Sequence, residues 1–185
     1  MVKLELNNTE NTERALAIAV DEALRLDTFM LVATTSGDAA AAALAAAREK
    51  GAEKRLIVIS SVFGSRGPDL NGMTAERKKE LDDANVRIIT AAHVLSGAER
   101  AMSTRFKGIY PSEIIAHTLR MFSQGVKVAV EIAAMALDAG AIPHGKPIVA
   151  VGGTGRGADT AVVLTPAYTQ DIFATKIHEI LCKPY

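Results

Sequence analysis

Apolar residues in this chain follow two patterns: short continuous runs, and longer segments in which they recur every three or four positions. The runs Phe29–Thr34 and Arg55–Ser60 predict strands, and the second is typical of a strand buried on both faces. Further strands are predicted at Val86–Thr90, Pro147–Val151 and Ala161–Leu164. Strands that alternate with helices predict an α/β fold, a three-layer α/β/α sandwich around a mostly parallel sheet.

Segments with helical spacing separate these strands. They are predicted at Thr9–Leu26, Ala39–Arg48, Thr74–Asn85, Pro111–Phe122 and Gly125–Gly140. The last segment is apolar nearly all round, apart from Lys127, Glu131 and Asp138, so we expect it in the core or in a subunit interface.

Two segments have weaker patterns. Ala91–Gly108 is irregular, but Ser96-Gly97-Ala98-Glu99 matches a capping box and predicts a helix N-terminus there. The tail from Thr169 to Tyr185 predicts a helix and then a strand near Ile180. Because the pattern contains no linker and no internal repeat, we expect the 185 residues to form a single domain.

Composition narrows the classes of partner. Apolar residues make up 49% of the chain and charged residues 23%, and the formal net charge is zero. A neutral chain without tryptophan has neither the field nor the aromatic platform that nucleic-acid binding uses, nor the charge that an anionic membrane attracts. No stretch is apolar enough for a membrane span. With Cys182 as the only cysteine no internal disulfide can form, so we expect a cytoplasmic protein. The apolar last helix and the zero net charge favour a homo-oligomer.

The turn after the first strand, Thr34-Thr35-Ser36-Gly37-Asp38, has the composition of an anion pocket. It leads into an alanine-rich helix, whose first N–H groups have no intrahelical acceptor and lie at the positive end of the helix dipole. We expect Ser36 to cap that helix, Gly37 to let a phosphate approach, and the N–H groups of Asp38 and Ala39 to bind it. The alternative is an ordinary strand-to-helix turn in which Ser36 is only the N-cap.

Four unusual loops follow the predicted strands. They are Thr34–Asp38, Val62–Gly72, Ala92–Arg100 and Gly152–Asp159. In open α/β sheets, ligands bind beyond the carboxyl ends of the strands, at a switch in strand order. We therefore expect the four loops to gather at one edge and form a ligand site, with plain connections as the alternative.

The Gly152–Asp159 loop is rich in glycine, but its spacing differs from the dinucleotide fingerprint. Gly153, Gly155 and Gly157 alternate with other residues before a predicted strand, whereas G-x-G-x-x-G opens a helix. We interpret the loop as backbone that wraps a ligand, with Arg156 binding phosphate and Asp159 accepting from a hydroxyl or ring N–H. The alternative is a glycine-rich hairpin turn with a solvated arginine.

Few residues point to catalysis. His93 follows the third predicted strand, where it is either a ligand-binding residue or a partly buried structural histidine. A small hydrolase or isomerase that uses Asp38, Asp159 or His93 has the least support, because no nucleophile–base pair is visible. The other histidines share no ligand spacing with one another or with the cysteine, so no bound metal is predicted.

Three stretches resemble those of a known family. They are Ala92-His93-Val94-Leu95-Ser96-Gly97, Phe122-Ser123-Gln124-Gly125-Val126-Lys127-Val128 and Gly153-Thr154-Gly155-Arg156-Gly157-Ala158-Asp159, of which the last is the most specific. With Phe29–Ser60, they make most of the chain similar to free-standing archaeal and bacterial proteins that resemble the C-terminal α/β domain of pyruvate kinase. The resemblance implies a mixed sheet of five strands in order 3-2-1-4-5, with the last strand antiparallel, and places the first and last loops side by side.

The resemblance also implies a ligand. In pyruvate kinases the T-T-S-G loop can hold a phosphate of an allosteric sugar bisphosphate, and the free-standing family can bind flavin mononucleotide (FMN) through its phosphate. None of the 185 residues resembles the barrel and lid domains that carry pyruvate kinase chemistry, so kinase activity is not expected. We expect FMN at the sheet edge, with a phosphometabolite-sensing regulatory domain without catalysis as the alternative. The residues expected to bind the ligand are Thr34, Thr35, Ser36, Gly37, Asp38, Ala39, His93, Ser96, Gly97, Gly153, Thr154, Gly155, Arg156, Gly157 and Asp159.

Overall fold

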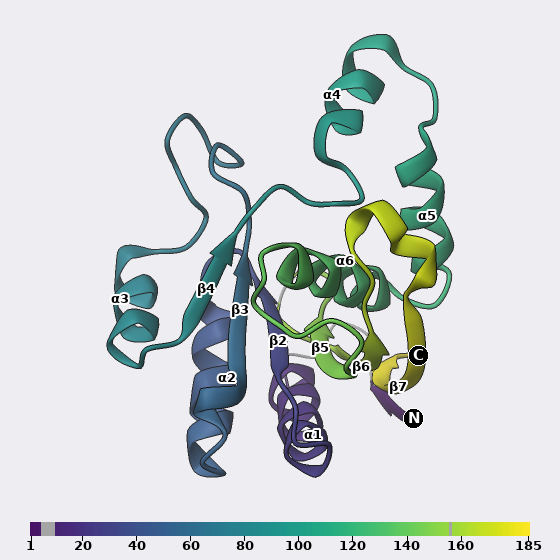
Figure 1. Cartoon of the computed structure of the whole chain (residues 1–185). Helices are drawn as coiled ribbons and strands as arrows, with labels where there is room; N and C mark the ends of the chain where they lie inside the picture. Colours follow the sequence, from purple (N-terminus) through teal and green to yellow (C-terminus); the bar gives the residue numbers. More distant parts are fainter. Residues whose placement is uncertain (5–9, 156) are drawn as a thin grey trace.

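The computed structural model describes residues 1–4, 10–155 and 157–185, which contain a mixed sheet of seven strands (Figure 1). The strands are β1 (Val2–Leu4), β2 (Met30–Thr34), β3 (Leu56–Ser60), β4 (Arg87–Thr90), β5 (Ile148–Gly152), β6 (Thr160–Thr165) and β7 (Lys176–Pro184). Their order across the sheet is β1-β7-β6-β5-β2-β3-β4. Strands β4, β3, β2 and β5 run parallel, β6 is antiparallel to both of its neighbours, and β1 is parallel to β7.

The α/β class predicted from the sequence is confirmed, but the expected count of five strands and the complete order that went with it are wrong. The five strands of that order correspond to β2–β6, which lie as β4-β3-β2-β5-β6 within the larger sheet. The strand predicted near Ile180 is confirmed as β7, after the short helical turn at Thr169–Ala174. The sheet continues past β6 with β7, whose residues 176–179 are exposed and mostly polar and so give a weak strand pattern. Strand β1 has three residues, too few for any periodic pattern.

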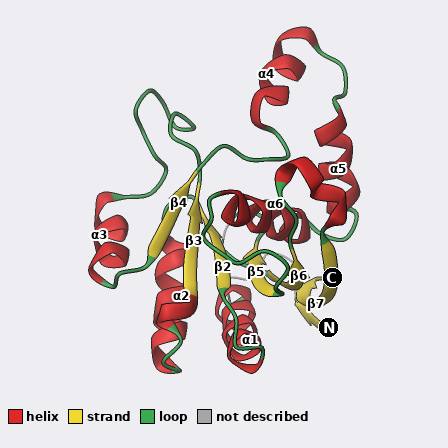
Figure 2. Cartoon of the chain, in the orientation of Figure 1, coloured by secondary structure: helices red, strands yellow, loops and turns green. Residues whose placement is uncertain are grey.

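Helices cover both faces of the sheet and complete three layers (Figure 2). Helices α1 (Asn11–Arg25), α2 (Asp38–Glu49) and α3 (Ala75–Asp83) cover one face, and α6 (Gln124–Asp138) covers the other. The short helical turns η1 (Glu53–Arg55) and η2 (Thr169–Ala174) precede β3 and β7. Across the described residues, no helix combines the length and the apolar character needed to cross a membrane.

Side chains that alternate along the strands divide the core into two halves. In β2, Met30 and Val32 pack toward α1 and α2, whereas Leu31 packs toward α6. Strand β3 repeats this arrangement with Val58 on the first face and Ile57 on the second. Burial on both faces explains why these two strands read as continuous apolar runs. Helix α6 is buried along most of its length within the chain's own core, one of the two places expected for it.

Helices α4 (Gly97–Phe106) and α5 (Pro111–Arg120) form an arm that projects from the body; we define the arm as residues 97–122 (Figure 1). Helix α4 begins where the capping pattern predicted, but the capping box does not form, because the Glu99 carboxylate accepts hydrogen bonds from Ser112 at the start of α5. No residue of α4 is buried. The arm exposes the large apolar side chains Met102, Phe106, Ile109, Ile114, Met121 and Phe122.

Candidate functional site

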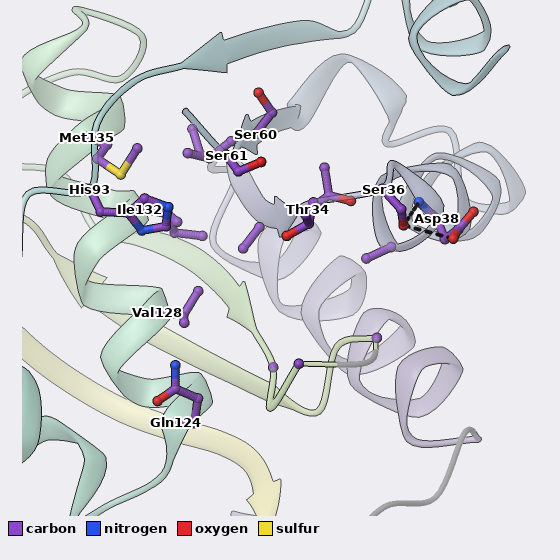
Figure 3. A pocket seen from close by; sticks show the side chains of 17 residues that line it. Thr34, Ser36, Asp38, Ser60, Ser61, His93, Gln124, Val128, Ile132 and Met135 are labelled. Carbon is purple, nitrogen blue, oxygen red and sulfur yellow. Dashed lines mark hydrogen bonds between the residues drawn. The ribbon is translucent and has the colours of Figure 1, made fainter. Parts of the chain in front are cut away.

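A pocket of about 430 Å³ opens at the edge of the sheet where β2 and β3 end (Figure 3). Its walls come from the ends of these strands, the first turn of α2, His93, one face of α6 and the glycine loop after β5. Strands β2 and β5 are neighbours, and the chain leaves them in opposite directions along the sheet, to β3 and to β6. The pocket therefore lies at the switch in strand order, where ligands of open α/β sheets bind.

The polar end of the pocket is the turn between β2 and α2. Thr34 Oγ1 accepts a hydrogen bond from the Gly37 N–H at 3.0 Å, and Gly37 has a left-handed φ of 100°. The first regular helical bond runs from the Ala41 N–H to the Gly37 carbonyl, so earlier N–H groups such as that of Ala39 have no helical acceptor. These groups and the positive end of the helix dipole make this end of the pocket favourable for an anion.

Ser36 and Gly37 differ from their expected roles in this turn. Helix α2 begins at Asp38 with Gly37 as its N-cap, and the Ser36 hydroxyl donates to Asp38 Oδ2 at 2.8 Å. A Cβ on Gly37 would lie 2.5 Å from Arg77 Cβ, and Gly37 is not among the residues that line the pocket. Glycine at this position therefore makes room for the Arg77 side chain of α3, not for a ligand.

The Asp38 carboxylate places a negative charge at the rim of the anion-binding turn. Arg77 Nε donates to Asp38 Oδ1 at 3.1 Å. Hydrogen bonds from Ser36 and then from Arg77 hold the pKa of Asp38 below its ordinary value, so the carboxylate is ionised. Because Arg77 carries the opposite charge, the N–H groups of the turn do not face an unpaired carboxylate.

One face of α6 forms the opposite end of the pocket. Gln124, Val128, Ile132 and Met135 follow at spacings of four and three residues, so they lie along one stripe of the helix, which is apolar except for Gln124. Figure 3 shows Ile132 and Met135 on the same side as His93, across the pocket from the turn after β2. The pocket therefore has a polar end suited to an anion and an apolar end suited to a ring.

His93 is held by a carboxylate buried in α6. His93 Nδ1 lies 2.9 Å from Glu131 Oε2, and the Leu95 N–H donates to Glu131 Oε1 at 3.1 Å. The Lys127 ammonium also bonds to Glu131 Oε2. The Glu131 side chain is fully buried, whereas 41% of the His93 side chain is exposed. His93 thus joins a buried ion pair to the open space of the pocket.

Burial opposes the charged forms of both Lys127 and Glu131. For Glu131, burial raises the pKa, but the hydrogen bond with His93 and the charge of Lys127 outweigh it, so the pKa lies below its ordinary value. For Lys127, burial is the larger effect and lowers the pKa, against the raising effect of Glu131. Glu131 is therefore the ionised group on which the surrounding donors converge.

The glycine loop after β5 contributes backbone to the pocket wall. Gly153, Gly155 and Gly157 line it. A Cβ on Gly153 would lie 2.1 Å from the Gly157 carbonyl oxygen, so the loop folds closely on itself. Arg156, expected to bind phosphate, lies outside the described residues.

Asp159 and Thr154 belong to a polar network within the protein. Thr160 Oγ1 donates to Asp159 Oδ1 at 2.7 Å, and the Thr154 hydroxyl donates to Asp159 Oδ2. Neither Asp159 nor Thr154 lines the pocket. Each carboxylate oxygen therefore already accepts one hydrogen bond within the protein, and contact of Asp159 with a ligand stays a prediction.

Neither the Val62–Gly72 loop nor the helix start at Ser96 and Gly97 contributes to the described pocket wall. The loop returns to the sheet, where Asn71 Nδ2 donates to the Ser61 carbonyl at 2.8 Å. The Ser61 hydroxyl is buried against the pocket and has no hydrogen-bond partner among the described residues. An unpaired buried hydroxyl is costly, and a polar ligand atom in the pocket would satisfy it.

Much of the expected site does come together. The expected residues that line the pocket are Thr34, Thr35, Ser36, Asp38, Ala39, His93, Gly153, Gly155 and Gly157. Sequence reasoning missed Ser60 and Ser61, although they follow β3 at the same edge and the rule that selected Thr34 applies to them. It also missed the α6 stripe, because a helix that is apolar nearly all round does not reveal which face lines a pocket.

The fold and the site define an α/β protein with a pocket at the switch point of a mixed sheet. No protein-family model matches the chain.

Proposed function

We propose that the protein binds a small phosphorylated ligand, with FMN as the best candidate. The observation that carries this proposal is a pocket with two unlike ends, a helix N-terminus at one and an apolar helix face at the other. In this proposal, the phosphate binds to the hydroxyls of Thr34, Thr35 and Ser36 and to the N–H groups of Asp38 and Ala39. The ring system lies along α6 and beside His93.

The residues present fit FMN. The volume of about 430 Å³ falls within the range of about 300–1,000 Å³ typical of small-molecule sites. The buried Ser61 hydroxyl, which has no hydrogen-bond partner among the described residues, offers a further polar contact to a ligand in the pocket. Bound FMN would supply hydride-transfer chemistry, while the protein would orient it and set its electrostatic surroundings. Membership of the pyruvate kinase C-terminal-domain-like family is part of the proposal, and pyruvate kinase activity is not.

The first experiment is a visible absorption spectrum of the freshly purified protein, followed by native mass spectrometry of the same sample. A flavin spectrum with the matching bound mass would support FMN. A colourless protein with another bound mass would favour a different phosphorylated metabolite. A colourless, ligand-free protein that takes up no added FMN would contradict the FMN assignment.

Ser36→Glu is expected to weaken FMN binding by about 100-fold or more while the fold stays intact. Two like charges about 4 Å apart cost about 4 kcal/mol at an effective dielectric constant of about 20, which is roughly a thousand-fold in affinity. Gln170→Glu, on exposed η2 outside the pocket, adds the same charge and is the matched control. Quenching of flavin fluorescence gives the Kd values, and circular dichroism checks the fold. If Ser36→Glu bound FMN with wild-type affinity, the assignment of the phosphate to the turn after β2 would be wrong.

A sensor without catalysis is the second candidate, and the arm is the observation that favours it. The segment that carries His93 into the pocket wall continues directly into α4, where no residue is buried. Short helices in water depend on packing for stability, so an arm with this much exposed apolar surface suits contact with a second copy of the chain. A ligand that moves His93 would then also move the contact between copies.

Ile109→Asp is expected to shift the protein from an oligomer to a monomer. Ile109 lies in the connection between α4 and α5 and is 79% exposed, and a charge buried there in a contact would oppose association. Phe63→Asp, on an exposed loop outside the arm, is the control. Light scattering measures both masses, with and without FMN. A wild-type protein that is monomeric under all conditions would rule out the sensor, as would an oligomer population that FMN leaves unchanged.

A cytoplasmic location is also part of the proposal. Cys182 is a free, buried cysteine, and burial raises the pKa of its thiol to about 11, so it stays protonated and unreactive. A described structure that uses no disulfide suits a reducing compartment, and cell fractionation tests the location.

A further inference from the structure

A charged pair lies within α6, a helix of mostly apolar residues, and one member of the pair contacts His93 in the pocket wall. Lys127 and Glu131 are four residues apart on α6, and their side chains are only 7% and 0% exposed. Burial of two charges costs several kcal/mol per ion, which their attraction offsets only when further hydrogen bonds are good. Apolar residues at the same two positions would often make a core at least as stable. The pair therefore points to a role beyond the packing of α6.

Glu131 is the acceptor on which donors from two segments converge. The Leu95 N–H donates to Oε1 at 3.1 Å, while Oε2 accepts from Lys127 and lies 2.9 Å from His93 Nδ1. His93 and Leu95 both belong to the segment after β4, so one carboxylate fixes that segment against α6. Because an ionised carboxylate accepts only, the proton of a neutral His93 ring belongs on Nδ1, and the lone pair is left on Nε2.

The His93 ring stands where the pocket meets this buried pair. Figure 3 shows the ring among the residues that line the pocket. Since Nδ1 is bound to Glu131, Nε2 is the ring nitrogen that a ligand can reach. The two aspartates considered as partners from the sequence are bonded elsewhere, Asp38 to Ser36 and Arg77 and Asp159 to two threonines.

We infer that His93 is the acid–base residue of the pocket, which exchanges a proton with the bound ligand through Nε2, and that Glu131 and Lys127 are its positioning residues. The inference rests on the proposed function, because the ligand is taken to be FMN or another phosphorylated molecule with a polar ring at the end remote from phosphate. A ligand N–H or O–H gives its proton to Nε2, Glu131 stabilises the imidazolium that forms, and the same proton returns to the ligand. The exchange oxidises and reduces nothing.

Charged groups of both signs surround His93. Glu131 is the negative group bonded to the ring, and the positive Lys127 bonds to the same carboxylate oxygen. Arg100 of α4 and Arg120 of α5 add positive charge near Lys127. A carboxylate that is shared in this way orients the ring through Nδ1 and leaves Nε2 free for the proton transfer.

Nuclear magnetic resonance of the ligand-free protein tests the positioning. With ¹⁵N-labelled histidine at about pH 8, above the range in which imidazole usually titrates, His93 is expected to carry its proton on Nδ1. The double variant Glu131→Gln with Lys127→Met removes both buried charges and keeps a polar group for the Leu95 N–H. It should lose the Nδ1 preference, because the amide can donate to the ring. A wild-type ring protonated on Nε2 would overturn the inference.

Calorimetry with FMN tests the contact of Nε2 with the ligand. A proton that passes between ligand and ring stays in the complex, but a ligand bound at Nε2 changes the protonation of the ring. Titrations in two buffers with different ionisation enthalpies give the net number of protons taken up or released per FMN. The FMN phosphate, whose second pKa is about 6, contributes to this number in every variant. Between about pH 5.5 and about pH 7.5, where imidazole exchanges protons, His93→Gln should therefore change the number by at least about 0.3 proton. His117→Gln, on the exposed arm outside the pocket, should leave it unchanged.

The outcomes separate the inference from the proposed function. If FMN binds, Ser36→Glu weakens it, and the wild type and His93→Gln exchange the same number of protons with the buffer at every pH, the inference fails and the proposed function stands. If FMN does not bind at all, the FMN assignment fails, and the tautomer of His93 in the ligand-free protein decides whether the ring is positioned as inferred.

Discussion

Glu131→Leu is expected to lower the free energy of unfolding by about 3–5 kcal/mol, because it leaves the Lys127 ammonium buried without its partner. The same change leaves the Leu95 N–H without its acceptor, which adds the cost of an unpaired buried donor. Addition of Lys127→Met should restore most of the lost stability, since the isolated charge is then removed. Urea unfolding followed by circular dichroism measures both variants.

The matched control is Asp82→Leu, which breaks the exposed pair between Lys78 and Asp82 at the same spacing of four residues on α3. It should cost less than about 1 kcal/mol, because solvent screens exposed pairs. If Glu131→Leu proved as mild as Asp82→Leu, the buried pair would not be a pair of charges in the folded protein. The orientation argument for His93 would then lose its ionised acceptor.

Low pH should remove the contribution of the Lys127–Glu131 pair to the free energy of unfolding. The pKa of Glu131 lies below its ordinary value of 4.5, because the His93 hydrogen bond and the Lys127 charge outweigh the opposing effect of burial. Near pH 4.5 the unfolded chain therefore binds more protons at this residue than the folded chain does. The contribution of Glu131 is fully present above that pH and is lost as the pH falls through the lower, folded pKa. Between about pH 5 and about pH 3, the wild type should lose more stability than the double variant Glu131→Leu with Lys127→Met.

The sequence predicts the fold where the pattern of apolar residues reflects the burial of the strand. Strands β2 and β3 are buried on both faces, so Leu31 and Val58 stand in unbroken apolar runs that only a covered strand explains. Strand β7 is harder, because its first four residues are exposed and only the stretch near Ile180 shows a strand pattern. Its neighbour β1 is three residues long. Those two strands gain their pairing from the completed sheet, which a local pattern does not contain.

The candidate site could likewise be predicted only in part. Thr34 and Ser36 could be found because a rule ties ligands to the carboxyl ends of parallel strands, and that rule needs only the order of elements. The contact between His93 and Glu131 spans 38 positions and depends on how α6 lies against the segment after β4, so no spacing reveals it. In the sequence, Glu131 is only a charged residue within a mostly apolar helix. Its role follows from its contacts with His93 and Leu95, which the sequence pattern does not show.

Gly152→Ala is expected to cost about 3 kcal/mol of stability and to weaken FMN binding at the same time. The φ of Gly152 lies outside the left-handed region, so space alone decides the effect. A Cβ would lie 2.5 Å from the Gly125 carbonyl oxygen and 2.9 Å from Val128 Cβ. A backbone atom of α6 can give way only if the whole helix moves off β5. That movement would also shift Val128 and the apolar wall of the pocket.

Gly140→Ala separates this crowding from the general cost of replacing a glycine. Gly140 has a φ of +61° just past the end of α6, and a Cβ there would meet nothing within 4 Å. It should cost about 1 kcal/mol, from backbone strain alone, and leave FMN affinity unchanged. Thermal unfolding and fluorescence titration compare the two variants. Equal losses of stability, or a Gly152→Ala protein with wild-type affinity, would mean that the contact of α6 with β5 does not fix the pocket wall. The ring end of the site would then have to be held by His93 and its buried partner instead.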